Sequence, residues 1–411
     1  MSENKENHVT TESEAPENNV IPIRPELQNY ADGGKRKKRF GNKFMRLTVL
    51  SLIVVAVICL LIFGNQFSGG RITRFFTSLG RSGNGEITYS FDDGQKNVYA
   101  AYQNSLAVVS GYGLTTFDAA GEELGTIQHV YSAPSLQVGN TLVMVCDIGS
   151  NQLTVMDEVG DTLIDLRSTG TFLDANISSG DTICCVEIAD GYRGILSAYD
   201  DSQNRIYRWY SSSGYFNQCA VSPDASYLCA IRLGNTDSEF ESTAVIFRTN
   251  SEDPIAEVPL GDQLISEVCF LNNSTVAIIG ENSTTFLNNR GDILNEYDYN
   301  AAHLRDYSVS RNGFIALSLN MYQAGNQYSV VTLNAKGEKQ AEQYIGEEIT
   351  KISAGGSYCA VLTPSQLLVY DQNLSLYASN EELQAVSSVV MLEDGAVILL
   401  GGGSGTLRFL Q

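Results

Sequence analysis

The sequence predicts an all-β protein, a β-propeller of eight blades, preceded by one transmembrane α-helix. Two observations predict the propeller. Short apolar runs of strand length fill the chain beyond residue 86, and a unit of two hairpins recurs about every 40 residues. A third observation, an uncharged apolar run of 18 residues near the N-terminus, predicts the helix. With 411 residues, 43% of them hydrophobic, the chain can bury a substantial core.

Charge is distributed unevenly along the chain. Residues 1–64 carry 9 Lys and Arg against 7 Asp and Glu, whereas the remainder carries 17 against 40, a net charge of −23. A large domain of that charge repels phosphate backbones, which predicts that it binds no nucleic acid. The same charge keeps the domain soluble beside a membrane.

The apolar run covers residues 47–64 and reads LTVLSLIVVAVICLLIFG. At about 1.5 Å per residue it is roughly 27 Å long, close to the roughly 30 Å of a bilayer's hydrocarbon core. The apolar part of a cleaved signal peptide is only about 7–15 residues long and ends at a small-residue cleavage site, which is missing here. The run therefore predicts a retained single-pass anchor.

A basic cluster before this run sets the predicted orientation. Residues 35–39 are all Lys or Arg, and Lys43 and Arg46 follow, whereas the far side carries only Arg71, Arg74 and Arg81. Because dense positive charge stays in the cytoplasm, the N-terminus is predicted to be cytoplasmic and the C-terminal domain extracytoplasmic.

The segments that flank the run have distinct compositions. Residues 1–46 combine an acidic, Asn-rich stretch with the basic juxtamembrane cluster, and few apolar residues, which predicts a disordered cytoplasmic tail. Residues 65–85 form a linker with one apolar helical face. This linker lies on the outer leaflet as an interfacial helix, continues the anchor, or packs under the domain. Residues 86–411 are predicted to form the extracytoplasmic β-propeller.

Two hairpins define the repeating unit of this domain. One has the form apolar–Asp/Asn–x–x–Gly–acid, in which the Asp or Asn caps a turn and the Gly takes the left-handed position. It occurs at residues 117–122, 156–161, 287–292 and 333–338. The other hairpin precedes it, and the first apolar residue after its turn marks each unit at spacings of 36 to 48 residues. These markers are Leu106, Leu142, Ile183, Leu228, Val276, Ile315, Tyr358 and Val397.

Eight markers predict eight blades, with seven as the alternative. After Val397 the chain has room for only a short third strand, Thr406 to Leu410. Residues 86–91 precede the first unit and have no partner there. We predict that they supply the outer strand of the last blade and close the ring, which removes the unpaired sheet edges.

These turns carry a family resemblance. The Ser222-Pro223-Asp224 turn before Tyr227 resembles the inner hairpin of WD40-like and TolB-like propellers, and the Asp-x-x-Gly hairpins resemble those of quinoprotein-like propellers. The layout of tail, basic cluster, single span and propeller resembles an uncharacterised membrane-anchored β-propeller family of Gram-positive bacteria, known only as a domain of unknown function. The resemblance implies a fold and a location, and it brings no catalytic residues.

No residue pattern predicts catalytic, cofactor-binding or metal-binding chemistry. The three histidines, His8, His129 and His303, are too isolated for a zinc site. Residues 200–204 hint at a calcium loop but lack the Gly and distal Glu of an EF-hand, so we interpret them as a polar turn. Trp209 is the only tryptophan, whereas quinone-dependent propeller enzymes dock their blades through many. Residues 401–405 are Gly-rich but precede no helix, so they predict a hairpin and no phosphate site.

Seven of the eight cysteines lie outside the predicted span, which contains Cys59. No Cys-x-x-Cys motif occurs, so redox and zinc-ribbon sites have no support. Most of the seven lie in apolar strand sequence and are predicted to be buried thiols. Cys219 and Cys229 flank one hairpin and form the best candidate disulfide.

Together these observations predict a non-enzymatic, membrane-anchored scaffold of the cell envelope that binds a protein or a ligand without a cofactor, with an envelope protein as partner. Two alternatives stay open. One is a cell-envelope hydrolase with carboxylates at the central channel, and the other is a ligand sensor that signals through the single helix.

Overall fold

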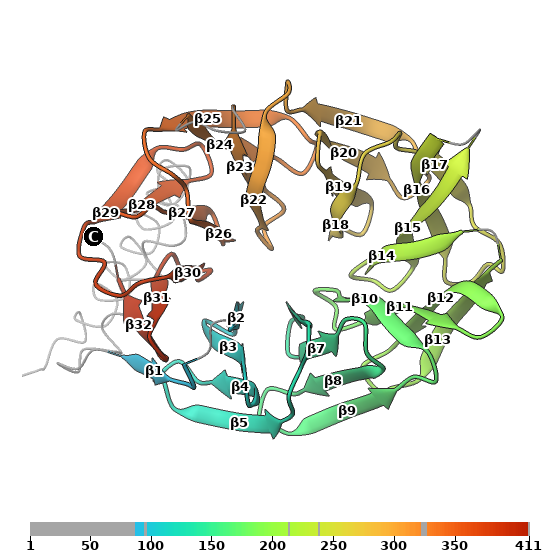
Figure 1. Cartoon of the computed structure of the whole chain (residues 1–411), viewed down its shortest axis with the longest axis horizontal. Helices are drawn as coiled ribbons and strands as arrows, with labels where there is room; N and C mark the ends of the chain where they lie inside the picture. Colours follow the sequence, from blue (N-terminus) through green and yellow to red (C-terminus); the bar gives the residue numbers. More distant parts are fainter. Residues whose placement is uncertain (1–86, 94–96, 213, 237–238, 322–326, 410–411) are drawn as a thin grey trace, which may run out of the picture. The chain divides into compact units, whose positions relative to one another are not determined.

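Eight four-stranded antiparallel sheets stand around a central axis and form a closed β-propeller (Figure 1). The computed structural model describes residues 87–93, 97–212, 214–236, 239–321 and 327–409. Among these residues no helix has the length and apolar character required to cross a bilayer. The predicted tail (1–46), span (47–64) and linker (65–85) lie outside the described residues and stay predictions.

Each of the first four blades is a run of four consecutive strands. Blade 1 contains β2 (Val98–Tyr102), β3 (Ser105–Ser110), β4 (Gly113–Phe117) and β5 (Glu123–Gln128). Blade 2 contains β6 (Pro134–Val138), β7 (Val143–Asp147), β8 (Gln152–Met156) and β9 (Thr162–Arg167). Blade 3 contains β10 (Thr171–Ile177), β11 (Ile183–Ala189), β12 (Tyr192–Tyr199) and β13 (Arg205–Ser211). Blade 4 contains β14 (Tyr215–Val221), β15 (Tyr227–Thr236), β16 (Glu239–Arg248) and β17 (Ala256–Pro259).

The remaining blades repeat this order until the last, which lacks its own fourth strand. Blade 5 contains β18 (Ile265–Asn272), β19 (Thr275–Gly280), β20 (Ser283–Asn288) and β21 (Ile293–Asp298). Blade 6 contains β22 (His303–Val309), β23 (Ile315–Asn320), β24 (Tyr328–Leu333) and β25 (Lys339–Ile345). Blade 7 contains β26 (Lys351–Gly355), β27 (Tyr358–Leu362), β28 (Leu367–Asp371) and β29 (Leu376–Asn380). Blade 8 contains β30 (Ser388–Met391), β31 (Val397–Gly401) and β32 (Ser404–Arg408).

The missing strand of blade 8 is β1 (Thr88–Ser90), which pairs antiparallel with β32. Tyr89 lies opposite Gly405 and is fully buried. The predicted closure of the ring by residues from its N-terminal side is therefore confirmed, as is the count of eight blades, and the alternative of seven is wrong. The third strand of blade 8 begins at Ser404, two residues earlier than expected.

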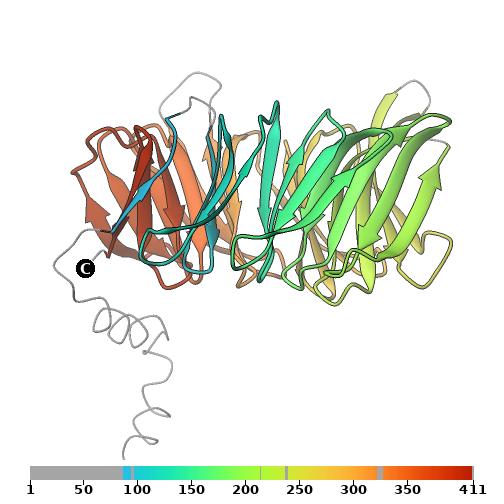
Figure 2. The same ribbon diagram turned by 90° about the horizontal axis from the view of Figure 1, so that it is seen from below.

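Antiparallel order gives the ring two different faces, which Figure 2 shows from the side. The turns between first and second strands and between third and fourth strands lie on one face, which we call the hairpin face. The turns between second and third strands and the connections between blades lie on the other, which we call the connector face. The first strand of every blade lines the central channel.

The Asp-x-x-Gly turns form as predicted, and two further copies were hidden in the sequence. In each of the four recognised turns the Asp or Asn side chain accepts hydrogen bonds from two backbone N–H groups. Asp118, for example, accepts from Ala120 and Glu122 at 2.8 and 2.9 Å. Asp200 and Asp371 cap their turns in the same way. Their glycine positions are occupied by Gln203 and Leu374 in the left-handed conformation. The polar-turn interpretation of residues 200–204 is thus confirmed.

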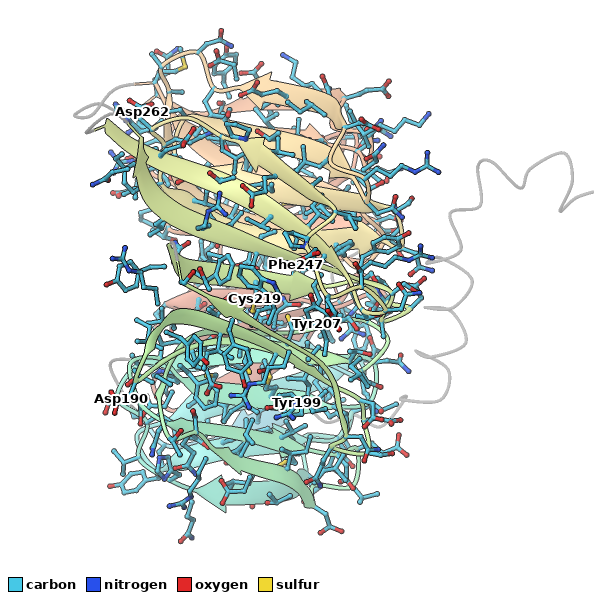
Figure 3. All side chains as sticks on the ribbon, turned by 90° about the vertical axis from the view of Figure 1, so that its right-hand side faces the viewer. Asp190, Tyr199, Tyr207, Cys219, Phe247 and Asp262 are labelled. Atoms are coloured by element: carbon cyan, nitrogen blue, oxygen red, sulfur yellow. The ribbon has the colours of Figure 1, made fainter. Side chains whose placement is uncertain are left out.

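The hydrophobic core is divided into eight clusters, one in each seam between neighbouring blades. Each cluster combines one face of a sheet with the facing side of the next, so no blade buries its apolar residues alone. The seam between blades 3 and 4 contains the single tryptophan: Trp209 packs 5.7 Å from Phe216 and 5.1 Å from Phe247 between ring centroids. Figure 3 shows Phe247, Tyr207 and Cys219 together between these two sheets.

Candidate functional site

An exposed group of tyrosines and arginines lies on the connector face of blades 3 and 4. It consists of Tyr192, Arg193, Arg208, Tyr210 and Tyr215, and we call it the Tyr–Arg patch. The three tyrosines are 45–48% exposed. The rings of Tyr192 and Tyr210 are 4.5 Å apart, and the guanidinium carbons of Arg208 and Arg193 lie 5.4 Å from Tyr210 and 5.6 Å from Tyr215. These contacts hold large side chains in place although solvent reaches them.

The blade 3 strands position this patch. The turn between β11 and β12 contains Gly191 with φ +90°, so that Tyr192 and Arg193 begin β12 at the connector face. The register of β12 with β13 sets Ile195 opposite Tyr210, beside this turn. Figure 3 views blades 3 and 4 from outside, with Asp190 of the same turn at the edge that carries the connector face.

An ion pair with a buried carboxylate anchors the patch to the sheet. Arg208 Nη2 donates to Glu187 Oε1 at 2.7 Å, and the Glu187 side chain is 6% exposed. The Ser168 hydroxyl donates to the other carboxylate oxygen. Because a buried carboxylate needs such partners, Arg208 is fixed beneath Tyr210.

Exposed aromatic residues favour the connector face. The five tyrosines that are more than a third exposed in the described part of the chain all lie at strand ends or turns on that side: Tyr112, Tyr192, Tyr210, Tyr215 and Tyr344. Exposed large side chains toward the hairpin face are mainly aliphatic: Leu124, Val159, Ile255, Ile293 and Leu376. Exposed tyrosine is therefore concentrated on the connector face, which also exposes aliphatic residues such as Val130 and Leu264.

A long hairpin rises beside the patch. Strands β15 and β16 pair along ten positions, from Tyr227 opposite Arg248 to Thr236 opposite Glu239. The flanking strand β14 reaches only Leu233, opposite Tyr215, so the tip of the hairpin projects past the sheet on the connector face (Figure 2). Near the base of the hairpin Arg232 forms a bidentate ion pair with Glu257, in which Nη1 and Nη2 donate to the two carboxylate oxygens at 2.8 and 2.6 Å.

A hollow of about 930 Å³ lies on the outer side of blade 1, next to the closing strand β1. Its walls include Phe91, Tyr112, His129 and Val130. His129 contacts the ring of Tyr131 at 4.6 Å between centroids, so its imidazole packs edge-on against an aromatic ring. The hollow adds a second aromatic surface to the connector side.

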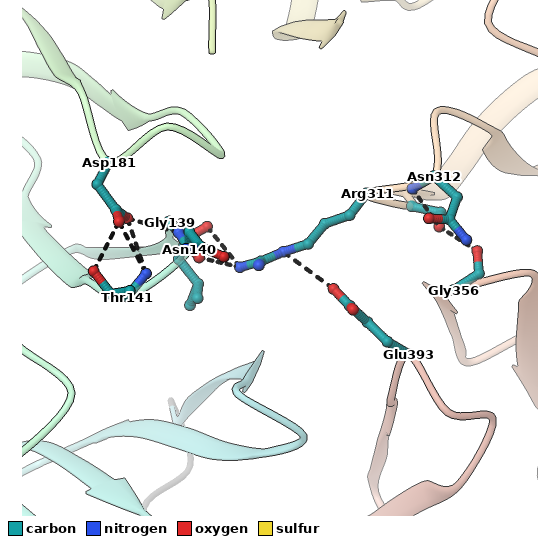
Figure 4. Close-up of polar contacts among 10 residues, drawn as sticks. Gly139, Asn140, Thr141, Asp181, Arg311, Asn312, Gly356 and Glu393 are labelled. Atoms are coloured by element: carbon teal, nitrogen blue, oxygen red, sulfur yellow. Dashed lines mark hydrogen bonds and ion pairs between the residues drawn. The ribbon is translucent and has the colours of Figure 1, made fainter. Parts of the chain in front are cut away.

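The central channel holds a cavity of about 1160 Å³ lined by β2, β22, β26 and β30. At its hairpin-face mouth Arg311 reaches from blade 6 to the opposite side of the ring (Figure 4). Its Nη2 donates to the carbonyls of Val138 and Gly139 in blade 2, and its Nε lies 3.6 Å from Glu393 Oε1 in blade 8. Arg311 therefore acts as a strut that ties three blades together across the mouth.

Four consecutive inner strands carry a polar residue at the same height of the channel wall. A β-bulge precedes each one, in β10, β14, β18 and β22. The register with the second strand shows that the positions are equivalent, because each faces the third residue after its blade's marker. We call these residues the channel belt: Asp174, Gln218, Glu267 and Asp306.

Carboxylates of the belt bind the next blade. Asp174 Oδ2 accepts the backbone N–H of Cys219 at 2.8 Å. Asp306 accepts the N–H of Ile352 at 2.9 Å and pairs with Lys351 at 3.0 Å. The Tyr307 hydroxyl lies 3.3 Å from Glu267 Oε2. These carboxylates are therefore engaged as latches between blades.

Burial in the channel wall changes their acidity. Desolvation raises the pKa of Asp174 to about 6, although the N–H bond from Cys219 opposes the shift. Desolvation, reinforced by the charge of Asp174, raises the pKa of Glu267 to about 8. Glu267 is thus mostly protonated at neutral pH and acts as a neutral hydrogen-bonding group.

The residues that the sequence singled out lie apart. His129 follows β5 in blade 1 and His303 begins β22 in blade 6. No cluster of His, Cys, Asp and Glu suited to a metal ion occurs among residues that the structure describes. Trp209 is a seam residue, and residues 401–405 form the tight turn between β31 and β32.

The candidate disulfide is wrong. Cys219 lies opposite Ala230, and Cys229 lies opposite Ala220, so the two thiols point to opposite faces of the blade 4 sheet. Cys219 enters the seam with blade 3, whereas Cys229 enters the seam with blade 5. All seven cysteines of the described domain are free thiols, and six are buried.

Sequence reasoning missed the patch and the belt. Tyr192 follows an Asp190-Gly191 turn, which is a usable signal for an exposed aromatic at a hairpin. The belt gives no such signal, since each bulge shifts the strand register by one residue and only the folded sheet reveals the shift.

Comparison with solved structures finds one match that supports the propeller fold. The C-terminal WD40 domain of Sif2 matches with a TM-score of 0.55 and 13% identity, over 79% of this chain and 97% of that one. The WD40 domain of Neurospora crassa Pan2 matches with a TM-score of 0.44 and 10% identity, over 68% and 90%. No curated protein matches the sequence. The model of the family of unknown function DUF5711 matches residues 83–398, and the chain belongs to that family.

Proposed function

We propose that this protein is a non-enzymatic binding module, anchored in the membrane by residues 47–64, whose propeller binds a protein partner through the Tyr–Arg patch. One observation carries the proposal: Tyr192, Tyr210 and Tyr215 expose nearly half of their surface while being held by each other and by two arginines.

The composition of the patch supports a protein partner. Tyrosine and arginine are enriched at the energetic centres of protein interfaces, because they offer a large contact area together with a polar end. Side chains that are already ordered lose less conformational entropy on binding. The neighbouring β15–β16 hairpin adds a projecting edge against which a partner can pack. A rigid ring with an aromatic surface and a raised edge suits a scaffold.

The channel supports a hydrolase less well. Glycoside hydrolysis needs two carboxyl groups that converge on one bond, either about 5–5.5 Å or about 6.5–9.5 Å apart. Here Asp174 and Asp306 are occupied by backbone N–H groups of the next blade, and Arg311 bridges the mouth. We therefore propose a binding role and no catalysis.

The orientation is part of the proposal. The basic residues 35–39 precede the span, which favours an extracytoplasmic propeller and a partner in the cell envelope. A cysteine introduced at Val159, which is 62% exposed, tests this in intact cells. A membrane-impermeant maleimide should label it and should leave a cysteine at Ser2 unlabelled. The reverse labelling would overturn the orientation.

The binding role is tested by capture with the full-length chain. Intact cells that express it are cross-linked, and the captured species are compared with those of a Tyr192→Ala/Tyr210→Ala double variant. We expect a discrete partner that the double variant loses by at least about tenfold, since central aromatic contacts are often worth 2 kcal/mol or more.

The matched control is Val159→Ala/Ile293→Ala, which removes two side chains of similar exposure toward the hairpin face. It should retain the partner. Equal capture by both double variants would contradict the assignment of the binding surface.

A further inference from the structure

Two cysteines from neighbouring blades meet in the seam between blades 3 and 4. Cys184 lies on β11 and Cys219 on β14, and their sulfur atoms are 3.5 Å apart. Both side chains are buried, with 0% and 1% exposure. The two belong to the same hydrophobic cluster, so the contact is a feature of how the blades pack.

The backbones around both thiols are fixed relative to each other. Asp174 on β10 accepts the backbone N–H of Cys219 at 2.8 Å, which ties blade 4 to the inner strand of blade 3. Cys184 lies opposite Asn176 on that same inner strand. One belt latch therefore connects the strand that bears Cys219 to the strand that pairs with Cys184.

We propose that Cys184 and Cys219 are a cross-linking site, at which a disulfide oxidant joins blade 3 to blade 4 covalently. Two S–H bonds break and one S–S bond forms. The two electrons and two protons pass to the disulfide of the oxidant, which leaves as two thiols. A protein S–S bond is about 2.05 Å long, so the sulfurs must approach by roughly 1.5 Å, a change that small side-chain rotations can supply.

The geometry selects this pair among neighbouring cysteines. Cys185 is next to Cys184 in sequence but points into the seam with blade 2, where Cys146 also lies. Cys229 faces the seam with blade 5. Successive residues of a strand point to opposite faces, so neither can replace Cys184 or Cys219 without a change of register.

Burial decides when the reaction takes place. Desolvation raises the pKa of Cys219 well above its ordinary value, and the thiolate is the species that attacks a disulfide. The folded seam also excludes the oxidant. Oxidation therefore takes place as the seam closes during folding, when strand pairing already faces the two thiols toward each other but the oxidant still reaches them.

The experiment uses the full-length chain in detergent, unfolded in urea, reduced, and then refolded with either a glutathione disulfide couple or reduced glutathione alone. Free thiols are blocked with N-ethylmaleimide after acid quenching, and the protein is digested without reductant. We expect one cross-linked peptide pair containing Cys184 and Cys219 in the oxidised sample only. Its mass should be about 2 Da below the sum of the two peptides, because two hydrogen atoms are lost.

Two variants provide the control. Cys184→Ala should abolish the cross-link, whereas Cys185→Ala removes the adjacent thiol on the other face and should retain it. The oxidised wild type should also unfold at a higher urea concentration than the reduced one, a difference that Cys184→Ala should lack. Recovery of Cys184 and Cys219 fully alkylated after oxidative refolding, or of Cys219 joined to Cys185 or Cys229, would overturn the proposal. The test does not depend on the partner of the Tyr–Arg patch.

Discussion

Replacing Tyr89 by alanine removes the largest side chain that the closing strand β1 contributes to the ring. Tyr89 has 0% exposure and packs edge-to-face on Phe117 at 5.7 Å between ring centroids. Truncating a fully buried aromatic side chain costs about 3–5 kcal/mol, because the lost apolar contacts leave a cavity. Whole domains are stable by only about 5–15 kcal/mol, so this one change should remove a large share of the stability.

The single tryptophan provides the assay. Trp209 lies in the seam between blades 3 and 4, three seams away from β1, and it contacts neither strand of the closure. Its fluorescence during urea unfolding therefore reports whether the closed ring unfolds as one unit. With a slope of about 3 kcal/mol per molar urea, the midpoint of Tyr89→Ala should fall by about 1–1.7 M.

Tyr112→Ala is the matched control, since this residue is 69% exposed on blade 1 next to the closure. Exposed substitutions of this kind change stability by about 0.5 kcal/mol or less. If Tyr89→Ala and Tyr112→Ala give the same Trp209 transition, the blades unfold independently, and the closing strand does not stabilise the ring as a whole.

Two further predictions concern the channel belt and the turns. The folded-state pKa of Glu267, about 8, exceeds its ordinary value, so the protonated side chain stabilises the fold. This contribution to the free energy of unfolding is complete below about pH 4.5. Up to about 4 kcal/mol of it is lost as the pH rises to about 8. Urea unfolding between about pH 5 and 8.5 should show that loss in the wild type and much less of it in Glu267→Gln, which stays neutral; parallel pH profiles would contradict the shift. Gly160→Ala should lower the free energy of unfolding by about 1–2 kcal/mol more than Gly191→Ala. Both glycines have φ near +90°, but only at Gly160 would a Cβ meet a backbone oxygen, that of Leu124, at 2.5 Å. Equal losses of stability in thermal unfolding would refute the close contact.

The fold was predictable because its repeat depends on local sequence patterns, namely strand-length apolar runs and turn residues. A marker residue such as Leu228 or Val276 begins the second strand of its blade or lies within it, and the turns before the markers need residues that tolerate left-handed backbone. Two copies of the Asp-capped turn were not recognised as part of the repeat, because Gln203 and Leu374 adopt that conformation without being glycine. Closure was predictable since the last unit had one strand too few.

The candidate sites depend on contacts between blades, which local patterns do not encode. Cys219 looked like the partner of Cys229, ten residues away, because a shared hairpin suggests proximity. Strand alternation separates them, and the curvature of the ring brings Cys184 from the previous blade instead. The belt residue Glu267 likewise acquires its function from a bulge and from Tyr307 on the next blade.

The most direct test of the binding role is site-specific photocross-linking in intact cells. A photoreactive amino acid replaces Tyr215 on the connector face in one full-length variant and Val159 on the hairpin face in another. We predict a discrete cross-linked product of defined mass from position 215 and none from position 159. Products of equal yield from both positions, or from position 159 alone, would contradict the account.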